Sequence, residues 1–579
     1  MSGNENAHKQ RNATSLRIFE DDLSVDEFPT QTSFQAFPST QTPSFFGSID
    51  GMYLEDQATW IIPAIQLPGK ASRPEEVPTE ARTGSYALQL RHLVRRSGIY
   101  ALSSLAIPLV SLLLAPFLTR QLSHDEYGSL AVMNIAIALV TCITQLGLWI
   151  AFLRAYTYDY TSRIERSGVL STTLVLMLLS SLPASLALVL CAPWVTTFLL
   201  SSPLHSDYVS IAALVVLLQN LAVPGLAWMH AENRAALFTT ASIANLLVNL
   251  STTVILVGVW HMGVVGSLLG TACGYGLVVL CTLPLILLRA GLRVRIDIAR
   301  GLLAFGIPTI SSYVSLWVLQ LADRFLLAHL RSLSETAIYT VAYTLGGVLS
   351  VLVLSPFSMA WGAMQFTVAR RDDAKDIYRF VFRWYSLFLF FAAYALALAG
   401  IFVLDAFFPL PYHTAAAIIP IVTLSTLFYG IYNFFTLGMS IHKKNWLGVV
   451  LTALAALANI GLNLLFIPLY GSLGAALATL CAYGLLALLM YIVNQRIYPI
   501  PCGIGTFGVA LAIGVALYIA STLFAQTQAT GVAWGIHIGA LCLYGGCLLL
   551  LGKWAGRNSK TGIHGNWRTL EHEDTSRAR

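Results

Sequence analysis

Residues 317–334, which read WVLQLADRFLLAHLRSLS, place an acid and a base side by side in an otherwise apolar run. Charges inside a bilayer are costly, so they usually line a transport pathway or pair with another group. A guanidinium binds phosphate through two parallel hydrogen bonds. We therefore predict that Arg324 binds a phosphate or an acidic sugar, and that Asp323 binds substrate or a coupling ion. The alternatives for Arg324 are an ion pair with another helix or an extended side chain that reaches the membrane interface.

Three further residues are candidate substrate ligands. Arg154 ends an apolar segment, where it could receive phosphate at the cytoplasmic entrance or act only as a positive anchor. Asn249 and Asn463 each follow another Asn by four residues, which puts two amides on one helical face. Such amides bind sugar hydroxyls, or bond between packed helices. Further candidate cavity liners are Gln145, Gln320, Trp361, Gln365 and Asn433.

The composition is that of an integral membrane protein. The 579 residues are 56% hydrophobic and 11% charged, with a mean hydropathy of +0.70, whereas soluble domains carry roughly 25% charged residues. The net charge of +6 therefore predicts no nucleic-acid partner. The eight cysteines show no CxxC spacing and no phosphate-binding GxxxxGK[ST] motif is present, so we expect no metal, no cofactor and no built-in ATP motor.

Fourteen apolar stretches follow one another from residue 98. Each is long enough, at about 20 residues, to cross a bilayer as a helix. The shortest connections are those at His261–Gly263 and Tyr470–Gly471. The predicted spans are 98–119, 130–153, 169–192, 208–229, 239–260, 264–288, 302–328, 337–362, 381–404, 413–439, 447–467, 472–493, 504–525 and 532–552.

The loops between these spans differ in charge. From residue 91 onward, 25 Lys and Arg residues lie before the first span, in or at the edges of alternate loops, or after the last span. Three lie on the other side, among them Arg324 inside the seventh span. Basic loops stay in the cytoplasm. We therefore predict a multi-pass protein of the cell (cytoplasmic) membrane with an even number of spans and both termini in the cytoplasm.

The spans repeat in sequence. RxLS elements begin at Arg120 and Arg331, 211 residues apart, and the glycine-rich stretch at 262–276 matches 470–484 at an offset of 208. A repeat of about 210 residues holds six spans, so both copies enter the membrane from the same side, which is one of the two architectures of secondary transporters. We interpret Arg120 and Arg331 as matched structural residues.

Aligning the RxLS elements places Asp323 and Arg324 opposite Leu112 and Leu113. The two charges therefore occur in the second copy alone. Because a purely architectural pair would be expected in both copies, this difference favours a site.

Four stretches carry a resemblance to a known family: 118–128, 146–154, 322–327 and 470–476. In this order and spacing the chain resembles, over residues 91–495, the polysaccharide (O-antigen type) flippases of the multidrug/oligosaccharidyl-lipid/polysaccharide exporter superfamily. The resemblance implies an all-α polytopic fold of about 14 transmembrane helices, with two pseudo-symmetric six-helix lobes around a central cavity and two C-terminal helices. It also implies export of a lipid-linked oligosaccharide by alternating access.

We accordingly predict a disordered cytoplasmic tail at 1–90, a first lobe at 91–300, a second lobe at 301–496, two added spans at 497–552 and a cytoplasmic tail at 553–579. The expected function is a flippase and not an enzyme. Its partners would be a lipid-linked glycan, membrane lipid and, through the N-terminal tail, polysaccharide assembly proteins. The alternatives are a cation-coupled multidrug antiporter of the same superfamily and a non-transporting scaffold of a polysaccharide assembly complex.

Overall fold

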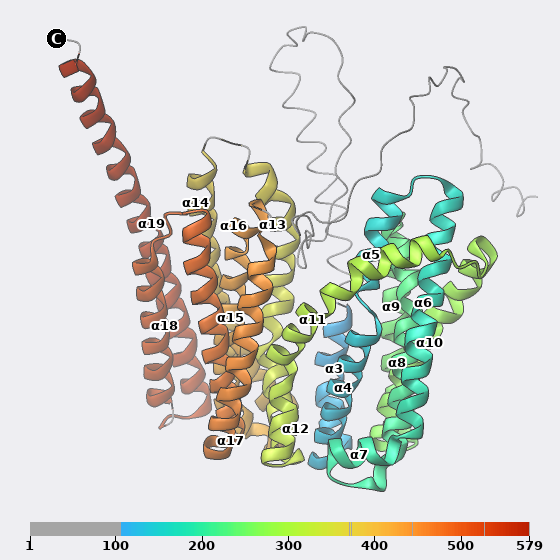
Figure 1. Ribbon diagram of the computed structural model, residues 1–579. Helices are drawn as coiled ribbons and strands as arrows, with labels where there is room; N and C mark the ends of the chain where they lie inside the picture. The colour runs from blue at the N-terminus through green and yellow to red at the C-terminus, as the bar shows by residue number, and fades with distance from the viewer. Residues whose placement is uncertain (1–105, 370, 372, 443, 526, 578–579) are drawn as a thin grey trace, which may run out of the picture. The chain divides into compact units, whose positions relative to one another are not determined.

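The computed structural model describes residues 106–577, apart from 370, 372, 443 and 526 (Figure 1). The predicted tail at 1–90 and the start of the first predicted span lie outside the described residues. Within the described part the chain folds into successive helices with no strand. The predicted all-α polytopic class is therefore confirmed.

The first half of the described chain forms one group of helices (Figure 1). α8 packs against α6, α10 and α4, α9 packs against α10, and α3 packs against α9. The bounds are α3 Ala106–Gln121, α4 His124–Thr144, α5 Leu148–Arg154, α6 Arg163–Leu190, α7 Ala192–Leu200, α8 Ser206–Ala231, α9 Ala235–Thr253 and α10 Gly263–Ala290.

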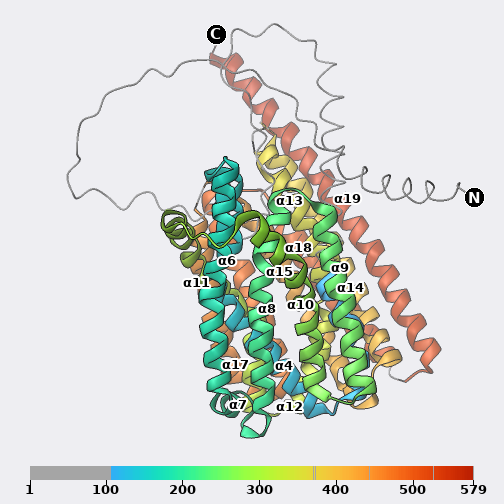
Figure 2. The same cartoon turned by 90° about the vertical axis from the view of Figure 1, so that its right-hand side faces the viewer.

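The second half forms another group, in which α17 packs against α11 and α15, and α14 packs against α15. α18 and α19 pack on each other and against α14. The bounds are α11 Ile296–Leu330, α12 Leu333–Gly346, α13 Ser355–Val368, α14 Ala374–Phe407, η6 Leu410–Ala417, α15 Ile419–Phe435, α16 Leu437–Ile441, α17 Asn445–Ile497, α18 Ile504–Ala525 and α19 Thr530–Arg577. α19 continues as a helix through residues 553–577 of the tail predicted at 553–579 (Figure 2).

In the described part of the chain, twelve helices are long and apolar enough to cross a membrane. Two features explain why this number is lower than the fourteen predicted spans. Only 16 residues of α3 are described, fewer than a span needs. α17 contains two predicted spans, 447–467 and 472–493, joined at Gly471, where φ is 59° and ψ is −133°.

α4 and α12 begin at the same end of the molecule, which we call the α4/α12 end. Ser123 caps α4 and accepts the N–H of Glu126 at 3.3 Å. Ser332 caps α12 and accepts the N–H of Glu335 at 3.1 Å. These matching caps lie 209 residues apart, so the predicted 211-residue alignment of the RxLS elements is wrong by two positions. The two halves correspond through the serine hydroxyls that cap α4 and α12, and not through the RxLS motif.

The corrected register separates the two arginines that we predicted to be matched. Arg120 lies in the last turn of α3, and its Nη2 donates to the carbonyl of Phe407 at 2.9 Å. Arg331 follows α11 and donates to the carbonyls of Ile467 at 3.1 Å and Pro468 at 2.7 Å. Each side chain still binds a carbonyl in another part of the chain, which is a structural role. In this register Asp323 and Arg324 lie opposite the apolar residues 114 and 115, so the charges remain in one copy only.

The turn between α11 and α12 clamps the break in α17. Arg331 donates hydrogen bonds to carbonyls at the end of the first segment of α17. Glu335 Oε2 accepts the N–H of Ser472, at the start of the second segment, at 3.2 Å. A cation at a helix C-terminus and an anion at an N-terminus both suit the helix dipole. Gly263, which begins α10, has a φ of 58° and lies 208 residues before Gly471, so the repeat places a left-handed glycine at both connections.

The two halves meet at the α4/α12 end. The Arg120–Phe407 bond joins them, and the ring of His124 stacks on Tyr412 at 4.5 Å between centroids. A Cβ added to Gly128 on α4 would lie 2.0 Å from the carbonyl oxygen of Leu333 on α12. The halves are therefore in close contact at this end.

α11 belongs to both halves. Its residues Ile298 and Leu302 pack in a core cluster with α5 and α6, whereas Leu319 packs in the core cluster of α13–α17. Gly306 approaches the backbone of the first half so closely that an added Cβ would lie 2.2 Å from the carbonyl oxygen of residue 146. Pro308 lies inside the helix between these contacts. The predicted boundary between residues 300 and 301 falls within this helix.

Gly471→Ala is expected to destabilise the protein. At a φ of 59° an alanine costs about 1–2 kcal/mol, and its Cβ would lie 2.5 Å from Glu335 Oε2. Gly461→Ala on the same helix, where an added Cβ meets nothing within 4 Å, is the matched control and should be neutral or slightly stabilising. Thermal unfolding of the purified protein in detergent measures both. Equal melting temperatures for the two variants would contradict the clamp.

Candidate functional site

Asp323 is fully buried within the second half. Its Oδ2 accepts hydrogen bonds from the Tyr339 hydroxyl of α12 at 2.5 Å and from the Thr479 hydroxyl of α17 at 3.2 Å, and its Oδ1 accepts the N–H of Arg324 at 2.8 Å. Both carboxylate oxygens are thus occupied, and three helices are joined through one side chain. This arrangement accounts for the burial of an acid without any ligand, while binding of substrate or an ion by Asp323 stays a prediction.

Arg324 points elsewhere, as expected for neighbours on a helix. It is 8% exposed, and its guanidinium carbon lies 4.2 Å from the ring centroid of Tyr343. A cation over an aromatic face gains roughly 0.5–2 kcal/mol. Its Nε is buried and has no hydrogen-bond partner among the described residues.

The other predicted ligands lie apart from this pair. Arg154, at the end of α5, faces Asp159 at 3.7 Å and the ring of Phe305 on α11 at 4.8 Å. From Phe305 to Arg324 the helix rises roughly 28 Å at 1.5 Å per residue. One phosphate cannot contact both arginines in this conformation.

The asparagine pairs bond along their own helices. Asn463 Nδ2 donates to the carbonyl and the side-chain oxygen of Asn459, at 2.9 and 3.0 Å, and both residues are fully buried. Within the described residues, Asn463 Oδ1 and Asn459 Nδ2 have no partner. In the first half, Asn249 accepts a bond from the Thr253 hydroxyl at 3.2 Å. Neither pair shows the bond between helices that we considered as the alternative, and their role in binding sugar stays a prediction.

A cavity of about 140 Å³ lies inside the second half, between α11, α13, α15, α16 and α17. We call it the second-half chamber. It lies toward the end at which α14 and α17 begin, which we call the basic end because Arg371, Lys375, Arg379 and Lys444 gather there. The aromatic and polar residues that line it are Ser312, Phe357, Ser358, Trp361, Gln365, Tyr429, Tyr432, Asn433, Thr436, Ser440, Asn445 and Thr452.

Three polar atoms of residues that line the chamber have no partner in the described part of the chain. They are Ser312 Oγ, Trp361 Nε1 and Gln365 Oε1, on side chains that are 2–5% exposed. A buried polar atom without a partner costs about 1–3 kcal/mol. Native structures contain few such atoms, and each calls for an explanation. Unpartnered polar atoms on three residues that line one cavity make this cavity our candidate ligand site.

Stacked rings fix the aromatic wall of the chamber. Phe357 stacks on Tyr385 with 3.7 Å between ring centroids, and Trp361 stacks on Phe434 at 4.8 Å. The Tyr378 hydroxyl donates to the backbone carbonyl of Gln365 at 2.6 Å, which holds this turn of α13. The α13 residues that line the chamber are therefore held by a rigid support.

None of the described residues that line the chamber is charged. Aromatic faces, amides and hydroxyls suit a neutral ligand rich in hydroxyl groups, and they give a cation no counter-charge. Pockets that enclose a whole ligand measure about 300–1,000 Å³. In this conformation the chamber therefore fits a part of a glycan, such as one sugar, rather than all of it.

The comparisons with known proteins agree with this architecture. Residues 117–358 match the family described as "Polysaccharide biosynthesis protein". The predicted resemblance to the polysaccharide flippases is confirmed. No curated protein matches the chain in sequence.

Solved structures of a flippase and of two transporters share the fold. The lipid II flippase MurJ, in an inward closed conformation, is similar over 79% of this chain and 99% of its own, with a TM-score of 0.57 at 16% identity. An inward-facing multidrug resistance MATE family transporter of the MOP superfamily is similar over 68% and 97%, with a TM-score of 0.53 at 13% identity. A mutant of the Vibrio cholerae MATE transporter VcmN is similar over 72% and 98%, with a TM-score of 0.51 at 16% identity.

The flippase-like fold brings together some of the polar residues that the sequence analysis singled out. Trp361, Gln365 and Asn433, named as candidate cavity liners, do line the chamber. Gln145 instead caps the end of α4. Ser312 and the two tyrosines 429 and 432 were missed, because serine and tyrosine in apolar helices are too common for their position alone to indicate a cavity.

Asp323→Ala is expected to lower the stability of the protein. Three hydrogen bonds are lost, and each is worth about 0.6 kcal/mol on average in a membrane protein, so the total loss is about 2 kcal/mol. Thr479→Val removes one of these bonds and should cost about a third as much. Unfolding in mixed micelles with increasing SDS measures both variants. A variant without the carboxylate that is as stable as wild type would refute the anchoring role.

Proposed function

We propose that this multi-pass membrane protein moves a lipid-linked oligosaccharide from the cytoplasmic to the outer leaflet of the cell membrane by alternating access of its two halves. The observation that carries the proposal is the uncharged second-half chamber, with its aromatic wall and three unpartnered buried polar atoms. The match to a polysaccharide biosynthesis family supports a glycan as the cargo. The lipid tail stays in the bilayer while the glycan passes through the protein.

Arg324 is our candidate for the phosphate that links glycan to lipid. Leu316 lines the chamber from α11, and Arg324 lies two turns further on, roughly 12 Å along the helix axis. A cation and a hydroxyl-binding chamber at this separation suit a ligand that carries phosphate at one end and sugar at the other. Arg154, which ends α5 and contacts Phe305 in the first third of α11, would then act only when the substrate enters.

The alternative, a cation-coupled multidrug antiporter, shares the fold. A cation-coupled antiporter is expected to carry a titratable group for the coupling ion, and the described residues that line the chamber include no Asp, Glu or His. A non-transporting scaffold would have no use for a preformed cavity with free hydrogen-bonding atoms. Both observations favour the flippase.

Substitution of the chamber residues tests the proposal. Trp361→Ala and Gln365→Ala should each reduce surface glycan by about tenfold, equivalent to ~1.4 kcal/mol of lost binding, and lipid-linked precursor should accumulate on the cytoplasmic side. Trp361→Phe keeps the ring and removes the N–H, so it should retain part of the activity. The readouts are surface glycan and precursor in a strain that depends on the plasmid-borne gene.

Trp194→Ala is the matched control, because this tryptophan on α7 is 83% exposed and far from the chamber in the fold. Comparable amounts of protein in the membrane must be shown for all variants. Wild-type glycan levels in both chamber variants would rule out the chamber as the glycan site. Drug sensitivity without glycan loss would favour the antiporter.

Alternating access is tested at the α4/α12 end. With cytoplasmic termini this end faces outward, and the contact of His124 with Tyr412 closes it. A His124→Cys/Tyr412→Cys pair, in a background with the eight native cysteines replaced, should form a disulfide that stops glycan export, and reduction should restore it. Export that continues in the oxidised protein would show that this end need not open.

A further inference from the structure

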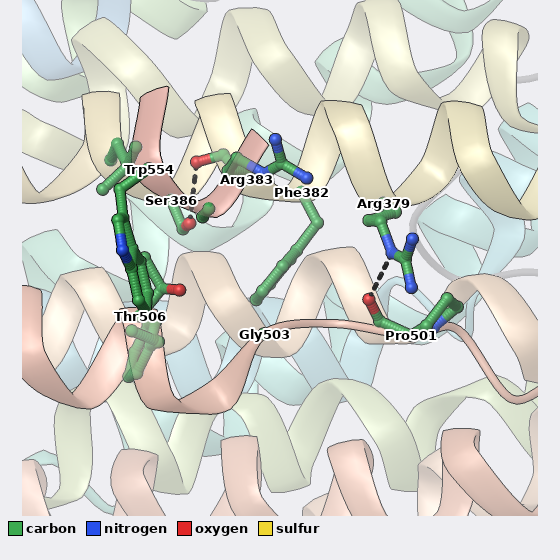
Figure 3. A pocket seen from close by; sticks show the side chains of 11 residues that line it. Arg379, Phe382, Arg383, Ser386, Pro501, Gly503, Thr506 and Trp554 are labelled. Carbon is green, nitrogen blue, oxygen red and sulfur yellow. Dashed lines mark hydrogen bonds between the residues drawn. The ribbon is translucent and has the colours of Figure 1, made fainter. Parts of the chain in front are cut away.

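A second cavity, of about 230 Å³, lies at the basic end between α14, the α17–α18 connection, α18 and α19 (Figure 3). It is separate from the second-half chamber, and none of its lining residues lines that chamber. Its charged lining residues are Arg379 and Arg383, one turn apart on α14, and no carboxylate is among the described residues that line it. We call it the interfacial pocket.

Arg383 is a partly buried cation that forms no ion pair with any of the described residues. No carboxylate of the described residues lies within 4.0 Å of it, and its neighbour in the pocket is a second cation. Arg379 is better satisfied, because it donates to the Pro501 carbonyl at 2.8 Å, as Figure 3 shows, and lies 3.9 Å from Asp376. Arg383 therefore contributes a positive charge that no carboxylate of the described residues pairs with, and an anion would neutralise it.

The thiol beside the pocket does not supply that anion. Cys502 lies between Pro501 and Gly503, which both line the pocket. Burial raises the pKa of this thiol to about 12, so it stays neutral at physiological pH. The missing negative charge must come from a ligand.

The surroundings of the pocket identify the kind of anion. Trp554 lines it and is 60% exposed, and Trp384 and Phe388, on the neighbouring face of α14, are also exposed. Aromatic side chains of this kind mark the membrane interface. Leu387 and Phe507 form the apolar part of the lining. The pocket therefore combines a positively charged wall with an apolar one at the depth of lipid headgroups.

The geometry points to a binding site for the phosphate headgroup of an anionic phospholipid of the cytoplasmic leaflet. Basic pockets between transmembrane helices on the cytoplasmic side bind such headgroups. The volume is below the range of about 300–1,000 Å³ typical of pockets that enclose a whole ligand, which suits a headgroup whose acyl chains remain in the bilayer. Arg383 binds the phosphate, and Ser386 and Thr506 lie beside it in the pocket. The site does not depend on the nature of the transported cargo.

Binding of short-chain lipids to the purified full-length protein tests this site. Dioctanoyl phosphatidylglycerol is titrated in neutral detergent and counted by native mass spectrometry, with dioctanoyl phosphatidylcholine as the neutral comparison. We expect the anionic lipid to bind at least tenfold more tightly to wild type, and Arg383→Gln to remove this preference, since one charge-assisted contact is worth about tenfold in affinity. Arg300→Gln, an exposed arginine on α11 with the same change of charge, should bind as wild type does.

A second variant guards against a folding defect. Thr506→Phe fills the pocket from α18 without changing charge, and it should also weaken binding of the anionic lipid about tenfold. Thermal unfolding without lipid shows whether each variant is folded. If Arg383→Gln is not folded, the lipid affinity of Thr506→Phe tests the site. Unchanged lipid affinity in a folded pocket variant would overturn the proposal. Displacement of the lipid by an equal concentration of inorganic phosphate would also overturn it, because the site would then serve a free anion.

Discussion

Every polar group that enters the hydrocarbon of a bilayer must find its partner within the protein, and this constraint orders the whole structure. It explains why Asp323 is surrounded by two hydroxyls and a backbone N–H, and why Arg331 and Glu335 close the ends of the broken helix α17. The same constraint makes its exceptions informative. Ser312, Trp361 and Gln365 carry buried polar atoms with no partner among the described residues. We expect a ligand to supply that partner.

The duplication separates features that both halves need for folding from features that occur in one half only. Capping serines and left-handed glycines recur in both halves at nearly the same offset, because two helices joined by a tight turn impose the same backbone demand wherever they occur. Asp323 and Arg324 do not recur, since apolar residues stand in their place in the first half. The two halves thus share a scaffold and differ in what they hold, with the charged pair and the chamber both in the second half.

Apolar length, loop charge and the repeat were sufficient to predict the fold class, because they report directly on burial in lipid. The short connections at Gly263 and Gly471 were also predictable, since few residues other than glycine adopt their backbone angles. The register of the repeat was not, because an RxLS motif does not reveal which serine caps the helix. The site was less predictable still. The chamber is built from residues 312–452, whose helices meet only in the folded protein. Arg383 looked like one more basic residue at the edge of a span until α18 and α19 were placed beside it.

α11 joins the two cores that the proposed alternating access would move relative to one another. Its first third is fixed in the first half by the close approach at Gly306, and its middle is fixed in the second half by Leu319. Between them stands Pro308, which removes one backbone hydrogen bond and is a common site of helix bending. α11 therefore adds a covalent connection to the contacts at the α4/α12 end, and the turn at Pro308 is where this connection bends most readily.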